Sequence, residues 1–276
     1  MLEQLKYKNH LNEVFEFGRD GIFVDSNDMH DYEWTATTKN ERIAALTRKV
    51  SKRQLPVKIS CETEAEGIAA RNKLFEIAEK DVLAMKHGQI ICGDYYFKCF
   101  VTKSQKKRYQ QSKRIMEATL TLTTDYPYWV KETKTTFGAT NFVSLFGSSG
   151  VTFPYDYPFD YYSTLENRPV TNTNFAASNF RLIIYGACTN PAINIAGHTY
   201  KVNCTIGENE YLTIDSATKK IYLTSNTGEV TNKFNSRSRD SYVFEKIQPG
   251  THTVAWNGEF GFDVILLEER SEPKWI

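Results

Sequence analysis

Histidines, serine nucleophiles and glycine-rich phosphate loops are the usual carriers of chemistry, and this chain places none of them in a known motif. Its histidines, at positions 10, 30, 87, 198 and 252, show neither H-E-x-x-H nor a pair at helical spacing. His30 lies near Asp28 and Asp31, a fragment of a metal site, but a polar loop explains these residues better. No G-x-S-x-G elbow, P-loop or G-x-G-x-x-G is present. We therefore expect no catalytic residue, metal ligand or cofactor.

Carboxylate pairs exist, as they do in any chain with 33 acidic residues. Three pairs can be posed as the acid and base of a glycosidase: Glu208 with Glu210, Asp156 with Asp160, and Glu268 with Glu269. Nothing around them favours one pair, so we assign all three to solvent. A carbohydrate-active enzyme is the third of three functional hypotheses.

A basic run is the strongest charge feature. Within residues 103–114 lie six cations: Lys103, Lys106, Lys107, Arg108, Lys113 and Arg114. One interpretation is a loop that contacts phosphates or an acidic partner. The other is a long solvated hairpin tip. We favour the solvated tip or a contact with protein.

An aromatic run over residues 153–162 is a second candidate contact surface. Tyr155, Tyr157 and Tyr161 in this run, and Trp256 further along, are candidate contacts for a glycan or a partner protein. Aromatic faces pack on sugar rings, but they also suit half-wet protein interfaces. We place a contact between domains or subunits ahead of sugar binding.

The composition limits the partners and the compartment. The formal net charge is +1, so long-range attraction of a polyanion is not a property of the whole molecule. Five cysteines without a C-x-x-C motif predict reduced, mostly buried thiols and synthesis in a reducing cytoplasm. No signal-peptide pattern opens the chain, and no run approaches the ~20 apolar residues of a membrane span.

One helix stands out among predicted strands. Thr63 and Glu66 form a capping box, apolar residues follow at 68, 74, 75, 78, 82 and 83, and Gly88 is the predicted left-handed end. The strands predicted before residue 130 cover 14–17, 22–24, 32–36, 55–60, 89–92, 95–101 and 114–123. Gly93-Asp94 is the predicted turn of a tight hairpin, and residues 115–122 alternate between apolar and polar.

The last third of the chain is a run of short predicted strands. They cover residues 211–216, 220–224, 241–245, 251–256 and 260–267, with turns at Pro249-Gly250 and Asn257-Gly258. Residues 131–140 are polar and indicate a linker or a domain-crossing segment. The predicted fold is mainly β, with a first domain over 1–130 and a β-sandwich over 131–276, whose last residues could return to the first domain.

Taken in order, five segments resemble the distal tail proteins of long-tailed phages with non-contractile tails, especially phages of Gram-positive hosts. They are residues 125–129 (D-Y-P-Y-W), 190–197 (N-P-A-I-N-I-A-G), the hairpin 211–223, residues 244–254 around Pro249-Gly250, and the tail 270–275 (R-S-E-P-K-W). His252 stands where the family commonly has Asn. Each motif is loose, and their shared order carries the resemblance, which spans nearly the whole chain.

The resemblance implies a six-fold ring at the end of the tail tube, with residues 1–130 forming the ring and a galectin-like or carbohydrate-module-like sandwich projecting from it. The implied partners are further copies of the chain, the tail tube protein, a tail-associated lysin or fibre hub, and in some relatives a receptor-binding protein or a host glycan. DNA would pass through the ring without specific binding. The implied location is the tail tip of a virion, and the implied role is not enzymatic.

The alternative is a lectin-like module that recognises a cell-surface glycan through Tyr155, Tyr157, Tyr161 or Trp256. This alternative is compatible with the ring, because one chain can do both.

Overall fold

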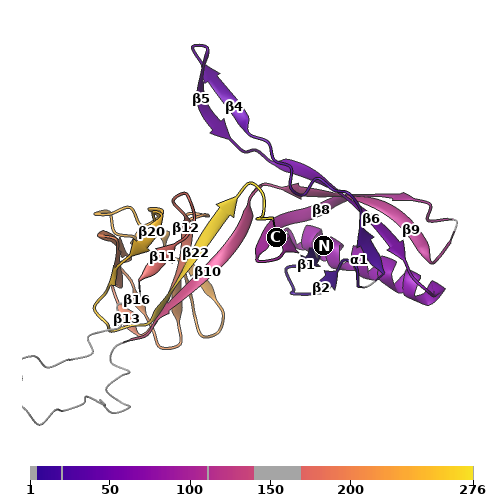
Figure 1. Ribbon diagram of the computed structural model, residues 1–276. Coiled ribbons are helices and arrows are strands. Elements are labelled where there is room, and N and C mark those ends of the chain that lie inside the picture. Colours follow the sequence, from indigo (N-terminus) through magenta and orange to yellow (C-terminus); the bar gives the residue numbers. More distant parts are fainter. Residues whose placement is uncertain (1–4, 20, 111, 140–168, 276) are drawn as a thin grey trace, which may run out of the picture. The chain divides into compact units, whose positions relative to one another are not determined.

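Strands dominate the residues that the structure describes, which are 5–19, 21–110, 112–139 and 169–275 of a computed structural model (Figure 1). Within these ranges the only α-helix is α1 (Glu64–Ala84), and η2 (Phe234–Ser236) is a short 3₁₀ turn. The prediction of a mainly β protein with one helix is confirmed. The chain forms two compact units: unit 1 comprises Met1–Lys131 and Glu269–Ile276, and unit 2 comprises Glu132–Glu268.

Unit 1 contains an antiparallel sheet in the order β2-β1-β7-β8. Its strands are β1 (Leu5–Lys8), β2 (Val14–Glu16), β7 (Gly88–Cys92) and β8 (Tyr95–Lys107). The predicted hairpin turn at Gly93-Asp94 is confirmed, because Cys92 pairs with Tyr95 across it. The start of β10 (Trp129–Phe137) adds to this sheet beside β8.

The second half of β8 belongs to another sheet of unit 1, in the order β3-β6-β9-β8. The other strands are β3 (Ile22–Val24), β6 (Ser51–Ser60) and β9 (Ile115–Thr124). β8 pairs with β7 up to Cys99 and with β9 from Phe100 onward, with a register shift near Val101. The predicted alternation in β9 is confirmed, because Met116, Ala118, Leu120 and Leu122 are buried in the core of unit 1.

Helix α1 packs on this core. The predicted capping box is present: Thr63 Oγ1 accepts from the Glu66 amide at 3.2 Å, and Glu66 Oε2 accepts from the Thr63 amide at 3.2 Å. The predicted end at Gly88 is wrong, because Met85 takes the left-handed conformation with φ 50° and Gly88 opens β7. A Cβ at Gly88 would lie 2.2 Å from Asp81 Oδ2 and 2.4 Å from the hydroxyl of Tyr7, so this glycine allows close packing.

The buried stripe of α1 differs in part from the predicted one. The buried residues are Gly67, Ala70, Leu74, Ile77, Ala78 and Asp81. Leu74 and Ala78 were predicted, and Phe75 is partly buried against the same core. Ile68, Val82 and Leu83 are exposed, because they lie outside the stripe that runs from Gly67 to Asp81.

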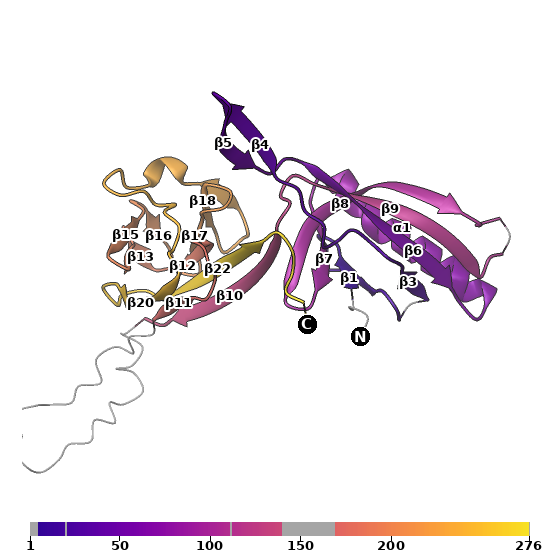
Figure 2. The ribbon, with the colours of Figure 1, turned by 45° about the horizontal axis from the view of Figure 1, so that its top comes forward.

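Two further strands of unit 1, β4 (Thr35–Lys39) and β5 (Arg42–Thr47), form a separate two-stranded ladder. Figures 1 and 2 show this ladder standing away from the other strands of unit 1. The strand predicted over 32–36 therefore begins only at Thr35, and β5 was not predicted.

Unit 2 is a sandwich of strands around its own core. One sheet has the order β10-β22-β12-β17-β18-β19, built from β12 (Asn179–Tyr185), β17 (Tyr211–Asp215), β18 (Lys220–Thr224), β19 (Val230–Asn232) and β22 (Phe262–Arg270). The opposing strands are β11 (Val170–Asn172) with β20 (Gly250–His252), β13 (Cys188–Thr189) with β16 (Thr205–Ile206), and β14 (Ala192–Ile195) between β15 (His198–Lys201) and β21 (Val254–Ala255). Both sets contribute side chains to one apolar cluster.

The predicted hairpin of unit 2 is confirmed, because Tyr211 pairs with Thr224 and Asp215 with Lys220. One prediction in this region is wrong. Residues 241–245 form a turn, not a strand, although Val243 and Phe244 are buried there. Within residues 131–140, predicted as a linker or a domain-crossing segment, residues 131–137 are strand: they continue β10, which passes from unit 1 into unit 2 at residues 131 and 132.

Candidate functional site

The hairpin of β4 and β5, called the arm from here on, is the most exposed regular structure of unit 1. Every residue of its two strands except Thr35 is exposed, including Ile43 at 66% and Leu46 at 55%. Asn40 and Glu41 form the two-residue turn, with φ 50° and 59°. A lone two-stranded hairpin is marginally stable in water, so the arm is suited to pack against a partner.

The sequence does hold a signal for the arm that the initial interpretation missed. Thr35, Thr37, Thr38 and Ile43 are β-branched residues that favour strands. Their apolar alternation is weak, because neither face of the arm is buried against unit 1. A sequence pattern that depends on one buried face therefore does not predict the arm.

A pocket of about 560 Å³ lies at the base of the arm, within unit 1. Its walls include Thr35 at the start of β4 and the segment between β5 and β6, together with Asp28, Asp31, Tyr32, Glu33 and Pro127. Arg48 and Arg53 are its two guanidinium groups. The guanidinium of Arg48 lies over the rings of Trp34, at 5.4 Å from the centroid, and Tyr128, at 4.7 Å.

Most of the predicted basic run has contacts within unit 1. Lys106 lies 4.4 Å over the ring of Phe75, and Arg108 pairs with Glu117 at 3.3 Å. Lys113 pairs with Glu64 at 3.4 Å, and Arg114 donates to the carbonyl of Cys61 at 3.3 Å. The contacts of Lys106 and Lys113 therefore join the hairpin of β8 and β9 to α1.

The remaining cations of the run lie on the other face of the sheet. Lys103 pairs in register with Thr121 and Lys107 with Glu117, on the face opposite the buried side chains of β9. β6 adds Lys52 and Lys58, which are exposed. These four lysines define the basic face of unit 1, and a role in contacting a subunit or a polyanion stays a prediction.

Of the four aromatic residues predicted as contacts, the structure describes only Trp256. Tyr155, Tyr157 and Tyr161 lie outside the described residues. Trp256 is partly buried against the core of unit 2, with its ring 5.2 Å from that of Phe262 and its Nε1 donating to the carbonyl of Phe260 at 3.1 Å. A role for Trp256 in glycan binding stays a prediction, with only part of the ring available.

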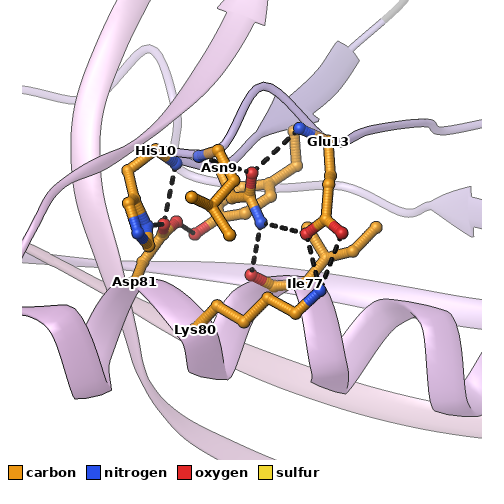
Figure 3. Close-up of polar contacts among 8 residues, drawn as sticks. Asn9, His10, Glu13, Ile77, Lys80 and Asp81 are labelled. Carbon is orange, nitrogen blue, oxygen red and sulfur yellow. Dashed lines mark hydrogen bonds and ion pairs between the residues drawn. The ribbon is translucent and has the colours of Figure 1, made fainter.

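A buried polar network, which the sequence interpretation missed, connects the start of the chain to α1 (Figure 3). Asp81 is fully buried and accepts from the hydroxyl of Tyr7 at 2.6 Å and from the His10 amide at 2.8 Å, and it lies 2.6 Å from His10 Nδ1. Asn9 and Glu13 extend the network, in which Lys80 donates to Glu13 at 2.7 Å. Burial raises the pKa of Tyr7 above its ordinary value, and the Cys99 thiol and the hydrogen bond to Asp81 raise it further.

This network has the residue types of a proton relay but the position of a structural support. His10 and Asp81 are held by backbone and side-chain donors around the 9–13 loop, and the aspartate has no exposed surface. The arrangement fixes the loop to α1. No cluster of three or more His, Cys, Asp or Glu side chains suited to a metal occurs in the described part of the chain.

Among the described residues, no helix is long and apolar enough to cross a membrane. The five cysteines are free thiols in the structure.

No protein-family model matches the chain, and no curated protein matches it. Solved structures match it in fold. The SPP1 Dit protein, described as a paradigm of the hub adsorption apparatus in phages that infect Gram-positive bacteria, gives a TM-score of 0.58 at 11% identity over 98% of this chain and 100% of its own. A chain of the phage P2 baseplate in its activated conformation gives 0.62 with Ca and 0.63 with Sr, at 12% identity, over 99% of this chain and 100% of that chain.

These likenesses confirm, at the level of the fold, the resemblance read from the sequence. They cover 98–99% of this chain, so the likeness in fold extends over both units.

Proposed function

We propose that this protein is a structural component of a phage tail tip, where six copies form a ring at the distal end of a long non-contractile tail. The ring joins the tail tube protein to the tail-associated lysin or fibre hub, and in some assemblies to a receptor-binding protein. It leaves a channel through which DNA passes without specific binding. The role is structural, it is carried out in the virion, and it involves no catalysis.

The likeness in fold to SPP1 Dit over 98% of the chain supports the tail-tip role. The single observation that supports self-assembly is the exposure of the arm. The arm exposes Ile43 and Leu46 on a hairpin that pairs with no other strand in the described part of unit 1. In a closed ring each subunit offers one surface and receives another, so an arm of this kind finds its partner on the next copy.

The test is the mass of the purified protein by light scattering, with negative-stain images of the same sample. We expect a six-subunit ring with an open centre for the wild type. The variant Ile43→Ser removes one apolar contact from each interface, which is worth about 1.5 kcal/mol, and weakens self-association about tenfold.

The matched control is Val230→Ser, which makes the same kind of change at a 61% exposed residue of unit 2. It is expected to leave assembly unchanged. A wild-type protein that stays monomeric at all concentrations contradicts the self-assembling ring and puts the lectin-like alternative ahead, to be judged by glycan-array binding.

A further inference from the structure

Arg48 is a half-buried cation without an anionic partner among the residues that the structure describes. Its Nε and Nη1 atoms are buried and have no hydrogen-bond acceptor there. Burial lowers the pKa of its guanidinium, and the opposing contributions come from the phenols of Tyr128 and Tyr32, not from a carboxylate. Leaving a buried charge unpaired is costly, so this group calls for an explanation.

The neighbouring Arg53 differs from Arg48, because it has a hydrogen-bond acceptor and lies closer to acidic charges. Arg53 is 4% exposed, donates to the carbonyl of Met29 and lies 4.4 Å over the ring of Phe97. Burial lowers its pKa to about 10, with the charges of Asp28 and Asp31 acting in the opposite direction. Arg53 therefore has a hydrogen-bond acceptor within unit 1, whereas Nε and Nη1 of Arg48 have none among the described residues.

The guanidinium of Arg48 lies beside two aromatic rings. Its central carbon is 5.4 Å from the ring centroid of Trp34 and 4.7 Å from that of Tyr128, and neither ring supplies an acceptor for the N–H groups of Nε and Nη1. Ser51 Oγ is a second buried polar atom without a partner, and both side chains line the same pocket. Planar N–H donors beside a hydroxyl donor match the two oxygens of a carboxylate.

The charge of the pocket also fits a carboxylate. Four cationic side chains line it, Arg48, Lys49, Lys52 and Arg53, against three acidic ones, Asp28, Asp31 and Glu33, which leaves one positive charge in surplus. One carboxylate neutralises this surplus, whereas a doubly charged phosphate would leave the pocket with one negative charge in excess. The volume of about 560 Å³ exceeds that of a carboxylate, so the group can arrive on a side chain with its flanking residues.

We propose that Arg48, assisted by Ser51, binds the carboxylate of an acidic side chain from a neighbouring copy of this chain. The pocket lies where β5 leads into β6, at the base of the arm, so the contact is continuous with the interface assigned to the arm. The identity of the partner rests on the proposed ring. The carboxylate site itself rests on the geometry of the pocket.

The experiment compares self-association of the full chain with that of Arg48→Gln and Lys86→Gln, by light scattering over a concentration series. Both variants remove one positive charge from unit 1, but Lys86 is an exposed residue outside the pocket. We expect Arg48→Gln to weaken association at least about tenfold and Lys86→Gln to stay within about twofold. Equal effects of the two variants, or no effect of either, would overturn the proposal.

A second arm uses a small probe, N-acetylglutamate amide, with N-acetylglutamine amide as the neutral isostere. At millimolar concentration we expect the carboxylate probe to raise the melting temperature of the wild type, and not that of Arg48→Gln, while the neutral probe does nothing. No difference between the probes overturns the carboxylate site. A monomeric wild type contradicts the proposed ring but not the carboxylate site, because binding of the probe can be measured in any oligomeric state.

Discussion

Asp263 on β22 is a carboxylate held inside a sheet of unit 2, at 1% exposure. Lys134 Nζ lies 2.7 Å from its Oδ2, and the hydroxyl of Tyr185 donates to the same oxygen at 2.6 Å. Burial acts to raise the pKa of Asp263, but hydrogen bonds from Lys134, Tyr185 and Thr136 outweigh it, so the pKa lies below its ordinary value of 3.8. The ionised form is therefore favoured in the folded state.

A depressed pKa makes this residue a source of acid sensitivity. The stability that it contributes is present above pH 3.8, the value for the unfolded chain, and is lost as the pH falls through the lower folded pKa. We expect the difference in unfolding free energy between the wild type and Asp263→Asn to shrink between pH 7 and pH 3. Urea unfolding at the two values measures it.

Tyr185→Phe is the companion variant, because it removes one donor and keeps the carboxylate. It should retain part of the pH dependence that Asp263→Asn loses. A difference between wild type and Asp263→Asn that stays constant with pH would contradict a depressed pKa.

At the scale of elements, α1 approaches the end of the β8–β9 hairpin too closely for a side chain. Arg71 donates to the carbonyls of Ser112 at 2.6 Å and Ile115 at 2.8 Å. A Cβ at Gly67 would lie 2.3 Å from the carbonyl oxygen of Lys113. Glycine in a helix normally costs stability, but here it permits the contact between the helix and the hairpin.

Gly67→Ala is therefore expected to destabilise the protein, by about 1–2 kcal/mol, although alanine is the better helix former. Ala69→Gly, at an exposed position of the same helix, should also cost about 1 kcal/mol, for the opposite reason. Chemical unfolding of both variants measures the two costs. A more stable Gly67→Ala would show that propensity, not close packing, decides at residue 67.

Elements that bury one face were predictable from the sequence, and elements without such a face were not. The β9 alternation and the β17–β18 hairpin follow directly from their apolar residues. The arm buries neither face, and β10 continues as Lys131-Glu-Thr-Lys, which has the composition of a loop. Val243 and Phe244 are buried from a turn, so their apolar character indicated a strand that is absent.

The candidate site was less predictable than the fold, because its parts come together only in three dimensions. The basic run was visible as a sequence of charges, but its division between α1 and the basic face depends on the register of β8. Arg48 was not predictable, because what distinguishes it is the lack of an acceptor for a guanidinium that lies over the ring of Tyr128, eighty residues away along the chain.

At the scale of the whole molecule, the two units have separate cores that share no residue. The chain passes between them through β10 and β22. Separate cores of this size can unfold as separate cooperative transitions. The buried network around Asp81 belongs to unit 1 alone, so it offers a way to move one transition without the other.

Calorimetry of the full chain is expected to resolve two transitions. Asp81→Ala leaves the donors of Tyr7 and His10 without their acceptor, which costs about 3 kcal/mol and lowers one transition by roughly 10 °C. The other transition should stay in place. Glu79→Ala, at an exposed position of α1, is the control, and a single transition that shifts as a whole would contradict independent cores.

Residues 269–276 are part of unit 1, although residues 132–268, which precede them, form unit 2. Trp275 in this last segment stacks on His30, with ring centroids 4.1 Å apart. During translation the whole of unit 2 leaves the ribosome before this segment does. Unit 1 is thus begun first and completed last, and a ribosome that stalls within unit 2 leaves unit 1 without its closing segment.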